Sequence, residues 1–228
     1  MSYRTGPKIV TDGLVCCLDA ADRNSYSGSG GTWIDLTGNG HNGTLQGNTA
    51  FSSANNGGLF CDGNGDYITL GTKNFITTDF SVLMWIKPTT ATKELYLFSF
   101  GYNSPTTNGL LFRNLSSPYD LSAITINNGT GLPHQRTNTQ LENGKFYQVG
   151  WTRDGSTNNL YVNGESKKTF SDSTQLISCI YDIGWATTRN KTTAYHQGYI
   201  YNTMIYDKGL SSDEVTQNFE ATKGRFGL

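Results

Sequence analysis

The 228-residue chain carries 17 Lys and Arg against 18 Asp and Glu, so its formal charge of −1 gives no net positive field to hold a nucleic-acid backbone. No stretch approaches the roughly 20 apolar residues that a membrane-spanning helix needs. The 27 Gly, 13 Tyr and 11 Phe, with only 15% charged residues, are typical of many short strands joined by tight turns. We therefore expect one all-β domain, with neither nucleic acid nor a membrane as its partner.

The first residues of the chain show no strand pattern. Met1–Gly13 lacks the apolar core flanked by basic residues that marks a secretory signal, so we expect the protein to be made in the cytosol and not exported by that route. We predict that Met1–Asp12 is an extended arm that docks on a neighbouring subunit, and that residues 13–228 form the single domain. If the neighbouring subunit is a second copy of this chain, the protein is a homo-oligomer.

From Gly13 onward, apolar and polar residues alternate in short runs that end at Gly, Asn, Asp or Pro, which is the pattern of β-strands. Ten runs of this kind predict a sandwich of two sheets. They are Gly13–Asp19, Tyr67–Leu70, Phe80–Lys87, Glu94–Tyr102, Gly109–Arg113, Leu121–Ile126, Lys145–Arg153, Asn159–Val162, Ile180–Gly184 and Gly198–Tyr206.

Two hairpin turns and one helix complete the elements that the sequence predicts. Asp-Gly at 154–155 and Asn-Gly at 163–164 supply the positive φ angles of tight hairpin turns, so we predict a three-stranded meander across 149–167. Leu210–Lys223 is the single helical pattern, with Ser211 or Ser212 as its cap and Gly224 as its end. By contrast, 24–58 is dense in Gly, Ser, Asn and Thr and predicts long surface loops.

The four cysteines, at positions 16, 17, 61 and 179, fit neither a paired CxxC metal site nor a dense disulfide framework. We interpret them as buried thiols. Cys16 and Cys17 are adjacent in a predicted strand, so their side chains point to opposite faces of its sheet.

Five motifs, in order along the chain, resemble the concanavalin A-like domains of the laminin G type in bacterial and phage proteins, over about Gly13 to Phe219. They read GLVCCLDAADRNSYSGSGGTWIDLTGNGHNGTL, GGLFCDGNGDYITL, FSVLMWIKP, FYQVGWTRDGSTNNLYVNG and GYIYNTMIYDKGLSSDEVTQNF. The resemblance implies a jelly-roll sandwich of two antiparallel sheets, often with one bound calcium, that serves in adhesion, sugar binding or assembly.

Two of the segments are similar to a narrower group, the structural proteins of marine and cyanobacterial tailed phages. These segments are LDAADRNSYSGSG near the start of the chain and NFEATKGRFGL at its end. In a phage, the resemblance implies a virion component made in the host cytoplasm, such as a capsid decoration protein, a head fibre or a tail-associated adhesin. Its partners would be other virion proteins.

A calcium site is the best chemical hypothesis for the loop that begins at Asp35. Hard cations take oxygen ligands from carboxylates, amides and backbone carbonyls, and this Gly-rich loop supplies all three. The resemblance implies Asp35, Asn39 and Asn42 as calcium ligands, with Asp19 as a further one. The alternative is that Asp35 and the asparagines only form Asx-turns.

Exposed aromatic side chains stack on the apolar face of a sugar ring. Trp185, Tyr195, Tyr199 and Tyr201 form the richest group for carbohydrate binding, and Tyr199 and Tyr201 share one face of their strand. The alternative is that they are core residues or cross-strand pairs.

The sequence lacks the alternating carboxylates, such as E-x-D-x-E, that β-sandwich glycosidases place about 5 to 10 Å apart. Its three histidines are far apart and outline no Ser-His-Asp arrangement. We therefore expect a protein that is not an enzyme. A phage virion structural protein is the first hypothesis, a carbohydrate-binding adhesin that recognises a host cell-surface glycan is the second, and a glycoside hydrolase is the third.

Overall fold

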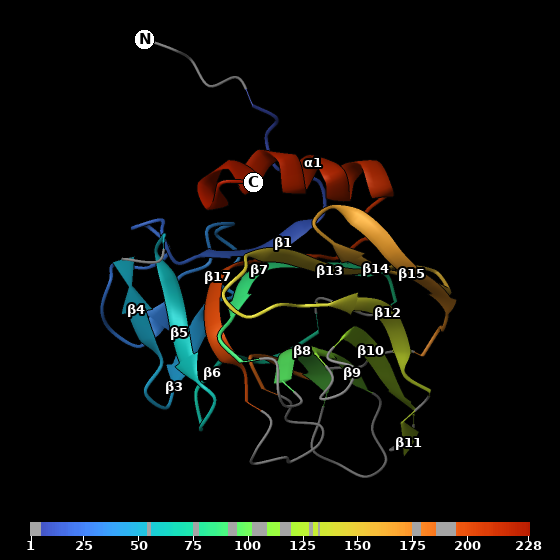
Figure 1. Ribbon diagram of the computed structural model, residues 1–228, viewed down its shortest axis with the longest axis horizontal. Helices are drawn as coiled ribbons and strands as arrows, with labels where there is room; N and C mark the ends of the chain where they lie inside the picture. The colour runs from blue at the N-terminus through green and yellow to red at the C-terminus, as the bar shows by residue number, and fades with distance from the viewer. Residues whose placement is uncertain are drawn as a thin grey trace.

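The computed structural model of the chain describes residues 6–53, 56–74, 78–90, 95–101, 109–114, 120–127, 130–131, 133–174, 179–185 and 195–228. Two antiparallel sheets pack face to face, and one helix lies across the outer face of one of them (Figure 1). The prediction of an all-β, jelly-roll sandwich with a short C-terminal helix is confirmed.

The first sheet has eight strands and carries the helix. Its order is β15-β14-β13-β7-β17-β5-β4, with β1 paired to the other half of β17. The strands are β1 (Leu14–Asp19), β4 (Ala50–Ser52), β5 (Gly58–Asp62), β7 (Phe80–Pro88), β13 (Tyr147–Asp154), β14 (Thr157–Val162), β15 (Glu165–Ser171) and β17 (Gln197–Tyr206).

The second sheet has nine strands and packs beneath the first. Its order is β11-β10-β9-β8-β16-β6-β3-β2, with β12 paired to β10. The strands are β2 (Thr32–Trp33), β3 (Gly43–Gln46), β6 (Tyr67–Lys73), β8 (Leu95–Gly101), β9 (Gly109–Asn114), β10 (Asp120–Asn127), β11 (Thr130–Gly131), β12 (Gln135–Gln140) and β16 (Cys179–Ile183).

All ten predicted strands are present, and β13, β14 and β15 form the predicted meander. The prediction of long loops over 24–58 is wrong in part, because β2, β3 and β4 lie within it. These strands have two to four residues each, which is too short for alternation to stand out against Gly and Thr.

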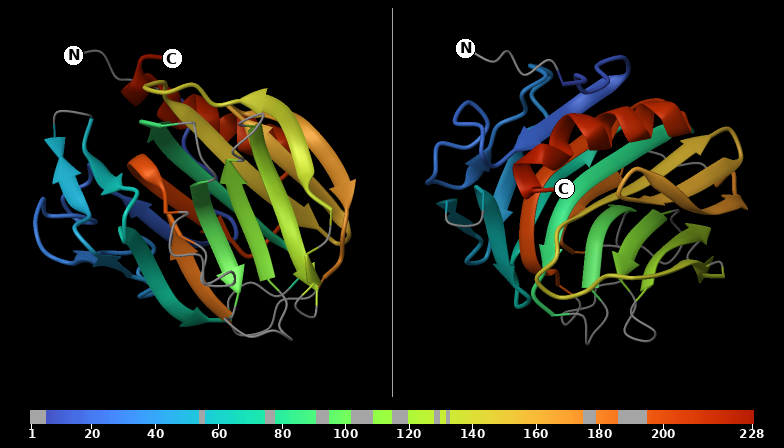
Figure 2. Two further views of the ribbon diagram at one scale, coloured as in Figure 1. Left: turned by 60° about the horizontal axis from the view of Figure 1, so that its bottom comes forward. Right: turned by 45° about the horizontal axis from the view of Figure 1, so that its top comes forward.

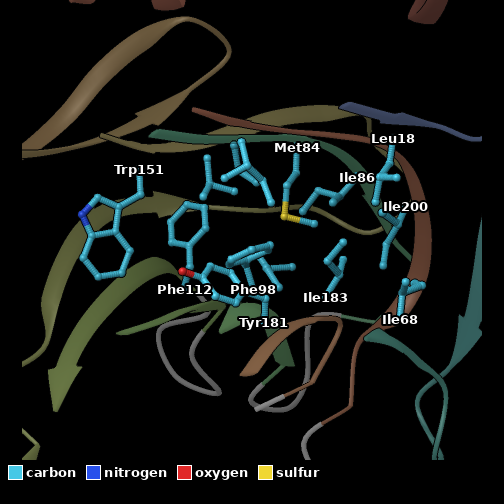
Figure 3. Packing of buried hydrophobic residues seen from close by; sticks show 14 of the residues in the cluster. Leu18, Ile68, Met84, Ile86, Phe98, Phe112, Trp151, Tyr181, Ile183 and Ile200 are labelled. Carbon is cyan, nitrogen blue, oxygen red and sulfur yellow. The ribbon is translucent and has the colours of Figure 1, made fainter. Parts of the chain in front are cut away.

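The main core lies between the two sheets, and Figure 3 shows its side chains. Met84 and Ile86 of β7 and Ile200 of β17 point down toward Phe98, Tyr181 and Ile183 of the second sheet (Figure 3). Each fully buried side chain of this size stabilises the fold by roughly 1.5–3 kcal/mol. Trp33 and Trp151 also belong to this cluster.

A second apolar layer covers the other face of the eight-stranded sheet. Trp85 lies there, fully buried, between the rings of Phe219 and Phe226, whose centroids are 5.7 and 4.2 Å from its own. Its indole Nε1 donates to Thr222 Oγ1 at 2.8 Å. Trp85 is therefore buried beneath the C-terminal segment and not between the sheets.

That segment is α1 (Ser212–Thr222), followed by the 3-10 turn η3 (Lys223–Phe226). Ser211 and Glu214 form a reciprocal capping box at its start, which selects Ser211 over Ser212 as the cap. The predicted end at Gly224 is wrong, because the chain continues helically through Gly224 and ends at Gly227 with a φ of 74°. Figure 2 shows the helix lying over the outer face of the eight-stranded sheet. No helix in the described ranges is long and apolar enough to cross a membrane.

Residues 6–12 have no regular secondary structure and lie against this helix. The backbone N–H of Val10 donates to Asn218 Oδ1 at 2.8 Å, and Tyr206 donates its hydroxyl to the carbonyl of Val10 at 3.0 Å. Lys208 pairs with Asp12 at 2.7 Å. The described part of the arm is thus bound to its own chain, and docking on a neighbouring subunit stays a prediction.

Of the thiols that the structure describes, all are free; Cys16 and Cys61 are buried as predicted, whereas Cys17 is only half-buried. Cys16 and Cys61 lie in the main core, while Cys17 points to the opposite face, as the adjacent positions predicted. Burial raises the pKa of Cys16, and raises the pKa values of Cys17 and Cys61 to about 12. The side chain of Cys179 lies outside the described residues.

Candidate functional site

The four aromatic residues proposed for sugar binding fall into two separate groups. Tyr199 and Tyr201 do share a face of β17, but it is the face that the C-terminal segment covers. Tyr201 is 0% exposed and packs against Phe226 and Phe146, at ring distances of 5.1 and 5.4 Å. Tyr201 therefore offers no surface to a sugar, and its assignment to the site is wrong. Tyr199 is half-buried between Phe60 and Tyr201.

Trp185 and Tyr195 form the second group, together with Tyr67. The rings of Trp185 and Tyr195 are nearly parallel, with an interplanar angle of 13° and centroids 5.7 Å apart. Tyr67 contacts both, at 4.8 Å from Trp185 and 6.2 Å from Tyr195. All three side chains are half-buried, so each keeps part of its surface open. We call these three residues the aromatic triad.

Strand register places the triad on the outer face of the nine-stranded sheet. Tyr67 begins β6, and because Ile68 points into the core, Tyr67 points away from it. After β16, Gly184 turns the chain with a φ of 84° and accepts a hydrogen bond from the backbone N–H of His196 at 2.7 Å. This contact brings Trp185 and Tyr195 together, although ten positions separate them.

A buried carboxylate lies beside the triad. Asp182 is opposite Ser99 on one neighbouring strand and Thr69 on the other, on the face away from the core. Ser99 donates its hydroxyl to the carbonyl of Trp185 at 3.0 Å, which holds the turn against the sheet. Burial, followed by the charge of Asp182, raises the pKa of Tyr67, so this carboxylate acts on the triad electrostatically.

Basic side chains occupy the far half of the same face. Tyr96, Arg113, Ser122 and Arg136 are paired in a row across β8, β9, β10 and β12. Arg113 donates to the hydroxyl of Tyr96 at 3.4 Å and lies 3.1 Å from a ring nitrogen of His134. The outer face therefore combines aromatic rings and a carboxylate at one end with guanidinium groups at the other.

The loop proposed for calcium is built around the Asp35 carboxylate, which is nearly buried. Its oxygens accept hydrogen bonds from the backbone N–H groups of Cys17, Thr37 and His41, at 2.9, 3.0 and 3.1 Å. The hydroxyl of Thr37 donates to it as well. Donors from the chain itself thus occupy the positions that a cation would take.

The other proposed ligands are also engaged. Asn42 accepts a hydrogen bond from the backbone N–H of Asp35 at 2.9 Å, and Asn39 donates its amide to a carbonyl of β1 at 3.0 Å. Asp19 forms an ion pair with Arg225 at 2.8 Å and does not join the loop. Among the described residues, no three His, Cys, Asp or Glu side chains gather as metal ligands. These hydrogen bonds favour the turn interpretation over the calcium hypothesis, which a calcium titration can test.

The two packed antiparallel sheets form a lectin-like sandwich fold. Residues 62–216 match the sequence profile of the laminin G-type family described as the concanavalin A-like lectin/glucanases superfamily. The chain belongs to this superfamily, as its five motifs indicated.

Solved structures share the fold at low sequence identity. Domain 4 of AbnA, a GH43 extracellular arabinanase from Geobacillus stearothermophilus in complex with arabinotriose, superposes with a TM-score of 0.70 at 19% identity, covering 94% of this chain and 99% of that one. Trypanosoma rangeli sialidase in complex with sialic acid gives 0.69 at 16%, covering 95% of this chain and 34% of the sialidase. The receptor binding domain of botulinum neurotoxin C/D mosaic serotype gives 0.67 at 16%, covering 93% and 52%. A search of curated proteins found no match.

Proposed function

We propose that the protein is a non-enzymatic carbohydrate-binding protein whose aromatic triad receives a sugar of a cell-surface glycan. The observation that carries this proposal is the near-parallel pair of Trp185 and Tyr195, half-open to solvent and next to the Asp182 carboxylate. The rings offer apolar faces to the C–H side of a sugar, while the buried Asp182 acts on the triad only through its charge. Two solved structures with this fold contain a bound saccharide, arabinotriose or sialic acid, which supports the same ligand class here.

The placement of carboxylates supports binding without hydrolysis. Asp182 and Asp120 lie on the outer face of the nine-stranded sheet, in β16 and β10, which β8 and β9 separate. Three strand spacings amount to about 14 Å. A glycosidase needs its two carboxyl groups roughly 5 to 10 Å apart, so these two do not form such a pair.

Glycan-array binding tests this function with three proteins. We expect the wild type to bind a set of glycans, Trp185→Ala to lose that binding, and Tyr199→Ala, an aromatic truncation on the other sheet, to keep it. Equal binding by both variants would contradict the triad as the site. Release of reducing ends from a bound glycan would contradict a non-enzymatic function.

The biological setting that we propose is a phage virion, where the protein would serve as a capsid decoration protein, head fibre or tail-associated adhesin. The support comes from the two segments that resemble phage structural proteins, which meet in the fold through the ion pair of Asp19 with Arg225. Quantitative mass spectrometry of purified particles tests this setting. Hundreds of copies indicate capsid decoration, a few to some tens indicate a tail or fibre, and none would exclude a virion role.

A further inference from the structure

A pocket separate from the aromatic triad lies beside the start of β5, at the end of this strand that is away from Tyr67. Strand β5 begins at Gly58 beside this pocket and ends at Asp62, five positions before Tyr67 of the triad. The pocket has a volume of about 420 Å³, and its described lining comes from residues 20–28 on one side and from Phe51, Ser53 and Gly57 on the other. This volume is within the range of roughly 300–1,000 Å³ that holds small ligands.

Two aromatic rings line the pocket. Tyr26 and Phe51 pack with centroids 5.6 Å apart at an angle of 44°. The hydroxyl of Tyr26 donates to the carbonyl of Gly30 at 2.7 Å, which fixes the ring. Ser27 and Ser53 add hydroxyl groups to the lining. The pocket therefore combines an apolar surface with hydrogen-bonding groups, as a site for a sugar ring requires.

Both walls are held in place by the rest of the fold. In one wall, the Asp19 carboxylate accepts from the backbone N–H of Ala21 at 2.9 Å, and Asp22 accepts from that of Asn24 at 2.8 Å. In the other wall, Arg225 donates to the carbonyl of Gly57 at 2.7 Å. A pocket organised before binding loses less entropy when a ligand enters.

One side chain that lines the pocket carries a positive charge and has no partner among the described residues. Arg23 lines the pocket, is exposed, and forms no hydrogen bond or ion pair with any other described residue. Of the neighbouring acids, Asp19 is paired with Arg225, whereas Asp22 accepts a backbone hydrogen bond from Asn24 and keeps its negative charge outside the pocket lining. No lining residue among those described is acidic. The charge in the pocket therefore favours an anionic ligand.

We propose that this pocket binds an acidic sugar residue, with Arg23 on the carboxylate and Tyr26 and Phe51 against the ring. This site is separate from the triad and has its own ligand class, so a glycan that carries both neutral and acidic residues can occupy the two sites through different units. Arg23 is available for binding, since its guanidinium forms no hydrogen bond or ion pair with another described residue.

Isothermal titration of the full chain with D-glucuronate, with D-glucose as the neutral probe, tests the proposal. We expect glucuronate to bind at least tenfold more tightly than glucose, because a charge-assisted hydrogen bond contributes roughly a factor of 10 to 100. Arg23→Ala should remove this preference, Arg23→Lys should keep part of it, and Ser53→Phe should block binding of both sugars by filling the pocket.

Trp185→Ala is the matched control, because it removes the triad and leaves the pocket intact. Glucuronate binding that survives in Trp185→Ala and disappears in Arg23→Ala assigns the acidic sugar to the pocket. Loss in Trp185→Ala with no change in Arg23→Ala places the sugar at the triad and overturns the proposal. Equal affinity for the two sugars, or no binding of glucuronate at millimolar concentration, also overturns it and leaves the glycan-array test of the triad unaffected.

Discussion

Arg225 and Asp19, 206 positions apart, form an ion pair of 2.8 Å between the C-terminal turn and the end of the first strand. The same guanidinium donates to the carbonyls of Asn56 and Gly57. The planar guanidinium of Arg225 therefore joins three segments that are distant in the sequence. Among the cationic side chains, only Arg presents several N–H donors in one fixed plane, as this arrangement requires.

Removal of the Arg225 guanidinium should destabilise the protein, although this side chain is partly exposed. We expect Arg225→Ala to lower the free energy of unfolding by about 2 kcal/mol, and Arg225→Lys to recover less than half of the loss. Urea denaturation monitored by tryptophan fluorescence measures both. Arg23→Ala is the control, and a change there larger than about 0.5 kcal/mol would show that Arg23 has a structural role.

The loop at Asp35 allows a direct test of the calcium hypothesis. Since hydrogen bonds from the chain occupy the carboxylate, we expect the melting temperature to be the same in calcium chloride and in EDTA. Asp35→Ala should lower stability by roughly 3 kcal/mol under both conditions, because it leaves several backbone donors unpaired. A calcium-dependent rise in the melting temperature that Asp35→Ala abolishes would instead establish the metal site.

Acid should destabilise the fold through His196. Burial lowers the pKa of this fully buried side chain to about 4, against about 6.5 in an unfolded chain. Between these values the unfolded state binds more protons, so the contribution of His196 is complete above about pH 6.5 and is lost as the pH falls toward 4. The loss amounts to roughly 3 kcal/mol.

The measurement is urea denaturation of the wild type and His196→Asn at pH 7 and pH 4.5. The variant should lose less stability between the two pH values than the wild type does. His41→Gln is the comparison, because partial burial lowers the pKa of His41 in the same direction, and its effect should be the smaller. Parallel losses in wild type and His196→Asn would show that other groups cause the acid sensitivity.

The buried thiols should be inert in the folded protein. The nucleophile is the thiolate, and raised pKa values keep Cys16, Cys17 and Cys61 protonated at pH 8. We expect iodoacetamide to leave these three positions unmodified in native protein and to alkylate them in guanidinium chloride, as peptide mass spectrometry will show. Rapid alkylation of Cys17 under native conditions would mean that β1 opens locally.

Substitutions in the two groups of aromatic residues should lower the stability of the protein by different amounts. Tyr201→Ala removes a fully buried ring beneath the C-terminal segment and should cost about 3–5 kcal/mol. Trp185→Ala removes a half-buried ring and should cost about 1 kcal/mol. Thermal denaturation compares them, and a similar large loss in both would show that the triad is part of the structural core.

Local patterns were sufficient to predict much of this fold. The strand at 80–88 contains an apolar run typical of a strand buried on both faces, and Ser211 with Glu214 supplies a complete capping box, so both elements could be recognised without tertiary information. Strands of two to four residues, such as Thr32–Trp33, exist because longer neighbours pair with them, and no local signal marks them.

The candidate site depends more on tertiary contacts. Trp185 and Tyr195 were predicted from their residue type, but Tyr67 joins them only through the pairing of β6 with β16. Tyr201 was misassigned because strand alternation identifies a face and not what covers it. Asp35 illustrates the same limit, since one of its donors, the N–H of Cys17, comes from a strand 18 positions away.

The helix and the aromatic triad lie on opposite outer faces of the sandwich, and residues 6–12 and the C-terminal turn η3 both lie on the helix side (Figure 1). The molecule therefore has one face that is covered by the helix and an opposite face that carries the aromatic triad. A protein immobilised on a sensor chip through its C-terminal residue would turn the helix side to the support and present the proposed binding face to the solution. For the proposed glycan-binding function, many copies oriented in this way would engage one glycan surface together, so that weak single contacts add up to firm attachment.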